Sequence, residues 1–107
     1  MNLGCVIYKK DFISGKLSAD WHLEINSKFI GGTGKAIGEP GKKFEGKYII
    51  NYFDFEGNKS NPYELFIKRK EKVYILEWYQ EGKLKCSGIG MLHDNNSLIA
   101  GWKNMIE

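Results

Sequence analysis

The sequence predicts an all-β protein: a single small antiparallel up-and-down β-barrel of about eight strands, built from two similar halves. Three observations lead to this fold class. Apolar and polar residues alternate along most of the chain, which is the period of a half-buried strand. Thirteen glycines and only two prolines among 107 residues suit strands joined by turns. An acid–Trp pair and a Gly-x-Gly motif each occur twice at nearly the same spacing.

The repeated motifs are the basis for the two halves. Asp20-Trp21 is followed by Gly32-Thr33-Gly34, and Glu77-Trp78 is followed by Gly88-Ile89-Gly90. The offset is 57 residues for the acid–Trp pair and 56 for the Gly-x-Gly motif, so the halves align with a single one-residue gap. A repeat of this kind predicts a duplicated β-unit.

The first half contains three predicted strands. Leu3 to Lys9 alternates as a strand, and Gly15 supplies the flexible position of the turn that follows it. Residues 17–25 alternate almost without error, whereas a helix there would place two carboxylates on its apolar stripe. Residues 29–37 form the third strand, and their glycines indicate a bulge, a bend or the close approach of another chain segment.

The second half contains five predicted strands, and a polar stretch, Glu56–Pro62, is the natural loop between the first two of them. The first strand is expected to place Phe44, Gly46, Tyr48, Ile50 and Tyr52 on one face. The predicted ranges are 44–55, 63–69, 73–79, 83–92 and 97–102.

Eight strands joined by short turns favour a closed barrel, because closure removes the exposed edge strands of a sheet. With eight strands the interior is either filled by side chains or holds one small ligand. The glycines are expected to let the coiled sheet bend and to leave room for the rings of Trp21 and Trp78.

The size and charge of the chain limit its organisation and its partners. A chain of this length forms one core, so we expect one domain over residues 1–107, with pseudo-repeats over about 3–43 and 44–102. The formal charge of +3, from 16 basic and 13 acidic residues, is low for a nucleic-acid-binding domain and argues against such a partner.

The sequence also bears on the cellular compartment. No charged or long apolar stretch precedes Cys5, and no run approaches the roughly 18 apolar residues of a membrane-spanning helix. We therefore expect a cytoplasmic protein without a membrane partner. Cys5 and Cys86 do not form a zinc motif and suit a reducing compartment as free thiols, while a disulfide between them is left open because sequence does not give its geometry.

The aromatic and glycine positions of the second half carry a family resemblance. They are Gly46-x-Tyr48, Gly57, Tyr74-x-x-x-Trp78, Gly82, Gly88-x-Gly90 and Leu98 to Trp102. This pattern resembles repeats in uncharacterised bacterial small β-barrel proteins of calycin-like (lipocalin- or avidin-like) appearance, over most of residues 44–102 and more weakly over 3–43. The resemblance implies barrel architecture and brings no catalytic residues with it.

The chemistry-bearing residues form no catalytic pattern. His22 lies on the polar face of its predicted strand, and His93 lies in a turn without a nucleophile beside it. Gly31–Lys35 ends in Gly-Lys, but a phosphate-binding loop also needs a following Ser or Thr and a helix. We therefore expect no enzyme activity, no metal and no cofactor.

The aromatic residues expected on inward faces are the best candidates for a site. Trp and Tyr combine a large apolar surface with a polar group that seeks a partner when buried. They either fill the barrel as core or line a cavity for a small apolar or planar ligand, and the mild positive charge would tolerate an anionic ligand, including a nucleotide. The candidate ligand-binding residues are Trp21, Tyr48, Tyr52, Tyr74, Trp78 and Trp102.

The alternative hypothesis is a protein–protein interaction module, an inhibitor or adaptor with a core filled by side chains. The loop Glu56–Pro62 and the basic hairpin Lys68–Lys72 would then carry the contacts, supported by outward Phe53, Phe55 and Tyr79. A cavity among the inward aromatic residues would distinguish the two hypotheses.

Overall fold

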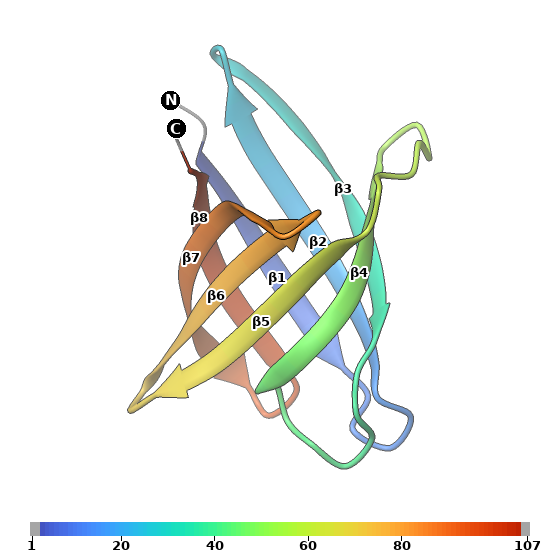
Figure 1. The fold of residues 1–107 in the computed structure, drawn as a ribbon, viewed down its shortest axis with the longest axis vertical. Helices are drawn as coiled ribbons and strands as arrows, with labels where there is room; N and C mark the ends of the chain where they lie inside the picture. The colour runs from blue at the N-terminus through green and yellow to red at the C-terminus, as the bar shows by residue number, and fades with distance from the viewer. Residues whose placement is uncertain (1–2, 106–107) are drawn as a thin grey trace.

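Eight antiparallel strands close a single barrel in the computed structural model, which describes residues 3–105 (Figure 1). The predicted all-β fold class and eight-strand barrel are confirmed. The predicted domain also includes residues 1–2 and 106–107, which lie outside the described residues. No helix long and apolar enough to cross a membrane occurs within residues 3–105. The strands are β1 (Leu3–Lys10), β2 (Lys16–Ile25), β3 (Lys28–Ile37), β4 (Gly46–Asp54), β5 (Tyr63–Lys70), β6 (Val73–Gln80), β7 (Lys83–Asp94) and β8 (Ser97–Asn104).

Each strand pairs with the next along the chain, and β1 pairs with β8 to complete the barrel. Val6 on β1 therefore lies opposite both Trp21 on β2 and Ala100 on β8. The strands alternate in direction, so the connections gather at two ends. The upper end in Figure 1 holds the β2–β3, β4–β5 and β6–β7 connections, together with the start of β1 and the end of β8.

The lower end of the barrel is closed by side chains. Phe44 is fully buried there, and its ring meets that of Phe12 edge to face at 6.0 Å between centroids. Lys10 is also buried, and its Nζ donates hydrogen bonds to the carbonyl of Lys43 at 2.6 Å and to the hydroxyl of Tyr48 at 3.1 Å. These contacts replace the hydration of the buried ammonium group.

The predicted strand over residues 44–55 is wrong at its start. β4 begins at Gly46, and Phe44 lies in the preceding connection rather than on a strand face. Gly46 has a φ of 138°, a conformation that residues other than glycine rarely adopt, and this interrupts the extended chain before β4. Phe44 is nevertheless inside the barrel, as its sequence position suggested, because the connection folds under the lower end.

The middle of the barrel is filled by the inward-facing residues of all eight strands. On β1, Val6 and Tyr8 are buried while the intervening Ile7 faces outward, which is the alternation that the sequence showed. The same alternation on the other strands supplies the rest of the buried apolar core, which includes Leu17, Ala19, Ala36, Ile50, Leu65, Ile67, Leu76, Leu98 and Ala100.

The glycines of the Gly-x-Gly motifs lie where neighbouring strands and the ring of Tyr52 come close to the backbone. A Cβ at Gly34 would lie 2.8 Å from the ring of Tyr52, and at Gly32 or Gly88 it would collide with a backbone carbonyl of the adjoining strand. The motifs therefore allow close approach of neighbouring strands and of Tyr52. The indole N–H of Trp21 donates to the carbonyl of Thr33, the middle residue of the first motif, at 2.9 Å. That the motifs leave room for both repeated tryptophan rings stays a prediction.

The duplication of the two halves stays a prediction. Trp21 lies on β2 opposite Gly32, whereas Trp78 lies on β6 opposite Cys86. The two tryptophans thus occupy corresponding strands of the barrel, β2 and β6, but face different residues across the ladder.

Candidate functional site

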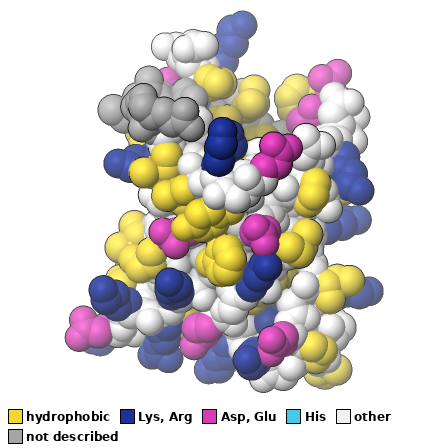
Figure 2. Space-filling model, in the orientation of Figure 1, with side chains coloured by type: hydrophobic (Ala, Val, Ile, Leu, Met, Phe, Trp, Pro, Cys, Tyr) yellow, Lys and Arg dark blue, Asp and Glu magenta, His cyan; other side chains and the backbone are white. Residues whose placement is uncertain are grey.

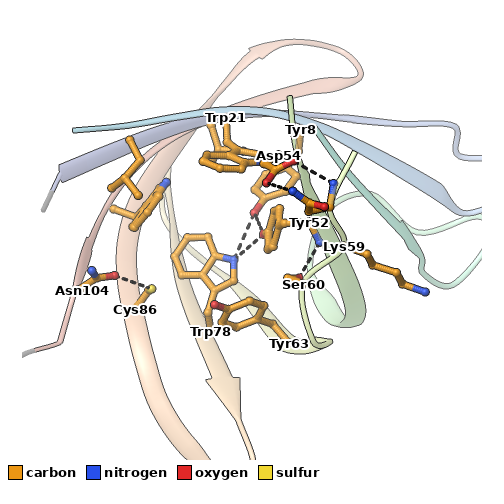
Figure 3. Close-up of a pocket in the computed structure, with 14 residues that line it drawn as sticks. Tyr8, Trp21, Tyr52, Asp54, Lys59, Ser60, Tyr63, Trp78, Cys86 and Asn104 are labelled. Carbon is orange, nitrogen blue, oxygen red and sulfur yellow. Dashed lines mark hydrogen bonds between the residues drawn. The ribbon is translucent and has the colours of Figure 1, made fainter. Parts of the chain in front are cut away.

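A pocket of about 470 Å³ occupies the upper end of the barrel (Figure 3). Its lining comes from seven strands and from the β4–β5 connection, which are far apart in the sequence, so only the closed barrel brings them together. The lining residues are Val6, Tyr8, Trp21, Leu23, Tyr52, Asp54, Asn58, Lys59, Ser60, Tyr63, Trp78, Cys86, Trp102 and Asn104.

Five aromatic side chains of this lining form what we call the aromatic wall: Trp21, Tyr52, Tyr63, Trp78 and Trp102. Tyr52 stands edge-on to Trp21 at 6.4 Å and to Tyr63 at 5.7 Å between ring centroids. Trp78 and Trp102 form a second, tilted pair at 6.3 Å. Such contacts stabilise the rings relative to one another.

Three polar groups meet at the base of the aromatic wall, and we call them the polar floor: the hydroxyls of Tyr8 and Tyr52 and the indole N–H of Trp78. The two hydroxyl oxygens are 2.6 Å apart. The Nε1 of Trp78 donates to Tyr52 Oη at 2.8 Å and more weakly to Tyr8 Oη at 3.3 Å. The dashed lines in Figure 3 show these contacts between three strands, β1, β4 and β6.

Burial raises the pKa of the tyrosine hydroxyls and of the thiol in the pocket, so these groups are protonated at neutral pH. Desolvation raises the pKa of both Tyr8 and Tyr52 well above the usual value for tyrosine. It also raises the pKa of the Cys86 thiol to about 11, and the thiol donates to Asn104 Oδ1 at 3.3 Å. A thiol with a raised pKa is a poor nucleophile at neutral pH.

The rim of the pocket is formed in part by the β4–β5 connection. The carboxylate of Asp54 accepts hydrogen bonds from the backbone N–H groups of Glu56 at 3.0 Å and Asn58 at 2.9 Å, and from the amide of Asn58 at 3.0 Å. Hydrogen bonds from Asn58 lower the pKa of Asp54, so the carboxylate is ionised and organises the connection. Lys59, which extends away from the cavity in Figure 3, is the cationic side chain at this rim.

The pocket contains four of the six residues predicted for the site: Trp21, Tyr52, Trp78 and Trp102. Tyr48 and Tyr74 also face inward and are buried, as predicted, but they lie outside the pocket lining. Tyr48 belongs to the closed end, where its hydroxyl donates to the carbonyl of Phe44 at 2.9 Å. These two tyrosines are part of the core.

Sequence reasoning missed several pocket residues. Tyr8 and Val6 share the inward face of β1, and the alternation of that strand could have identified them. Tyr63 begins the strand after the polar loop, and Cys86 was considered only as a thiol. The rim residues of the β4–β5 connection carry no periodic pattern, so the sequence offered no way to place them.

Other candidate groups lie away from the pocket. His22 and His93 are both exposed. His22 lies on the polar face of β2 as expected, but the prediction that His93 lies in a turn is wrong, because β7 continues to Asp94 and the turn follows it. Cys5 is exposed on the outer face of β1 while Cys86 faces inward, and both thiols are free, which answers the open question of a disulfide. Within residues 3–105, no cluster of three or more His, Cys, Asp or Glu side chains is placed to hold a metal ion.

Comparison of the chain with models of known protein families, with curated proteins and with solved structures found no match. The small eight-strand antiparallel barrel therefore stands on the structure alone.

Proposed function

We propose that this protein is a non-catalytic binding protein that holds one small apolar or planar molecule in the pocket at the upper end of the barrel. The observation that carries the proposal is the pocket itself: about 470 Å³ lined by five aromatic side chains above a polar floor. A volume of this size is in the range of small-molecule sites, which are mostly apolar with a few convergent polar groups.

The physical basis of affinity is the burial of apolar ligand surface. Each square ångström of apolar surface removed from water contributes about 25 cal/mol, less the cost of immobilising the ligand. The aromatic wall is held in place by edge contacts and hydrogen bonds, which reduces the ordering that binding requires. The calycin-like resemblance of the sequence agrees with such a role, and the exposed free thiol of Cys5 agrees with a cytoplasmic location.

The proposal is tested by tryptophan fluorescence and thermal unfolding in the presence of metabolites, nucleotides and lipids. A ligand that binds the folded barrel shifts the emission and raises the unfolding midpoint. Cys86→Phe fills the pocket and is expected to abolish both effects. Cys5→Phe places the same ring on the outer face of β1 and is expected to leave them unchanged.

A protein partner is the second candidate, and it becomes the leading one if every compound class fails to bind. Phe55 at the β4–β5 connection is 76% exposed, in agreement with the predicted role of that loop. Phe53 and Tyr79 are only half-buried, and Tyr79 packs edge-on to Phe66 at 5.5 Å. Charged side chains are interspersed among the apolar ones on the face shown in Figure 2, so that face offers no uninterrupted apolar surface.

A further inference from the structure

The polar floor has three polar hydrogens, one each on the Trp78 indole and the Tyr8 and Tyr52 hydroxyls. Only two of them are donated within the polar floor. The indole of Trp78 can only donate, and its principal acceptor is Tyr52 Oη at 2.8 Å. A single hydrogen lies between the hydroxyls of Tyr8 and Tyr52, whose oxygens are 2.6 Å apart. The structure gives neither hydroxyl a further side-chain or backbone partner among residues 3–105. One hydroxyl hydrogen is therefore left without an acceptor.

Burial decides which hydroxyl keeps the free hydrogen. Both tyrosines line the pocket, but Tyr8 has no exposed surface, whereas Tyr52 is half-buried and keeps some of its surface accessible. A hydroxyl that is buried without an acceptor is destabilising, so Tyr8 donates its hydrogen to Tyr52. Tyr52 then accepts from both Tyr8 and Trp78 and presents its own O–H to the pocket.

The charges around the pocket favour a neutral acceptor for this O–H group. Asp54 and Lys59 are the charged side chains of the lining, and both belong to the rim. An anion at the polar floor would lose its hydration without gaining a cationic partner there, which is costly. Burial also raises the pKa of Tyr52, so its hydroxyl stays protonated and able to donate.

We propose that the ligand is a neutral planar compound whose carbonyl oxygen accepts a hydrogen bond from Tyr52 Oη while its apolar body contacts the aromatic wall. This inference rests on the binding function proposed above and narrows it from apolar or planar molecules in general to neutral carbonyl compounds. Tyr52 is the residue that sets the orientation of the ligand.

The test uses 1-indanone and indane, which share a bicyclic skeleton and differ in the carbonyl group. Affinities are measured by nuclear magnetic resonance titration, following the indole N–H signals of the three tryptophans. For each protein we compare the dissociation constants of the two probes as a ratio. The hydration of the free probes is the same whichever protein is used, so it does not contribute to the difference between the wild-type and variant ratios. Tyr52→Phe is expected to reduce the preference for 1-indanone by about 2- to 10-fold, the value of a typical hydrogen bond.

Tyr8→Phe is the matched control. It removes the other hydroxyl of the polar floor but leaves Tyr52 with its indole contact and its free hydrogen, so the ratio should change less than in Tyr52→Phe. A preference that survives in Tyr52→Phe, or that falls in Tyr8→Phe instead, overturns the inference while leaving the binding function intact. If neither probe binds the wild-type protein, this inference fails, whereas the proposed function fails only if every compound class of the first test also fails to bind.

Two further measurements need only the wild-type protein. The infrared stretching frequency of the 1-indanone carbonyl is expected to be lower in the complex than in an alkane solvent, because a hydrogen bond weakens the C=O bond. An unshifted frequency contradicts the assignment to Tyr52. The anion 1-indanecarboxylate is expected to bind more weakly than 1-indanone, and tighter binding of the anion contradicts the preference for a neutral ligand.

Discussion

Tyr52 is the residue at which the apolar and polar parts of the pocket meet. Its ring stands edge-on to those of Trp21 and Tyr63, and its hydroxyl is shared with Tyr8 and Trp78. Alternation along β4 predicted that Tyr52 faces inward. It could not predict the hydrogen-bonded partners, because these come from β1 and β6 and meet only when the barrel closes.

Alternation gives the face of a residue but not its depth in the barrel. All six predicted aromatic residues face inward, yet Tyr48 and Tyr74 lie outside the pocket. Depth depends on how far each strand is staggered against its neighbours, which is a property of the whole sheet. This is why the composition of the aromatic wall was predicted only in part.

A close approach at the β1–β8 junction gives a prediction for single residues. A Cβ at Gly4 would lie 2.1 Å from the ring of Trp102, whereas the nearest atom to a Cβ at Gly101 is 3.9 Å away. Gly4→Ala should therefore displace the Trp102 ring and reduce the free energy of unfolding by about 1–3 kcal/mol, as overpacking does. Gly101→Ala should change it by less than about 0.5 kcal/mol. Urea unfolding measures both, and equal effects would contradict the contact.

At the scale of elements, the strands were predictable and the connections were not. Every observed strand boundary lies within two residues of the predicted one, because alternation persists along each strand. The connection before β4 was assigned partly to the strand because Phe44 continues the apolar alternation, and only the backbone conformation at Gly46 shows where the strand begins. The β4–β5 connection was recognised as a loop, but its role as the rim of the pocket follows from its folded path.

The order of the β4–β5 connection depends on Asp54. Asp54→Ala removes the acceptor of two backbone N–H groups, so the amides of Glu56 and Asn58 should exchange with solvent faster, and a probe bound in the pocket should dissociate faster. Asp11→Ala is the control, because Asp11 accepts from the backbone N–H groups of Ile13 and Ser14 in the turn at the closed end. It should speed exchange in its own turn without altering probe dissociation. Slow exchange at Glu56 and Asn58 in Asp54→Ala would contradict this role.

For the whole molecule, the buried ionisable groups determine how stability depends on pH. Burial raises the pKa of Tyr8 and Tyr52, raises that of Tyr48 to about 12 and raises that of Cys86 to about 11. Above their ordinary pKa values the unfolded chain releases protons that the folded protein retains, so the free energy of unfolding falls as pH rises. Lys10, whose pKa is lowered by desolvation, acts in the opposite direction just below its ordinary pKa of 10.5.

We therefore expect stability to be nearly constant between pH 7 and pH 8 with respect to these groups, to begin falling near pH 9, where the Cys86 thiol ionises in the unfolded chain, and to fall more steeply above pH 10. Each buried tyrosine contributes a slope of up to about 1.4 kcal/mol per pH unit above its unfolded pKa. Urea unfolding at pH 7, 9, 10 and 11 measures this dependence. Tyr8→Phe removes one such group and should reduce the alkaline slope, and a variant with the wild-type slope would show that Tyr8 does not retain its proton.

The pairing of β1 with β8 has a mechanical consequence. Because the two strands are antiparallel neighbours, Leu3 and Lys103 lie opposite each other and the ends of the described chain emerge side by side at the upper end (Figure 1). A force pulling these ends apart would break the hydrogen bonds between β1 and β8 one after another rather than all together. The strands β1 and β8 would thus separate first beside the pocket, before the closed end around Phe44 opens.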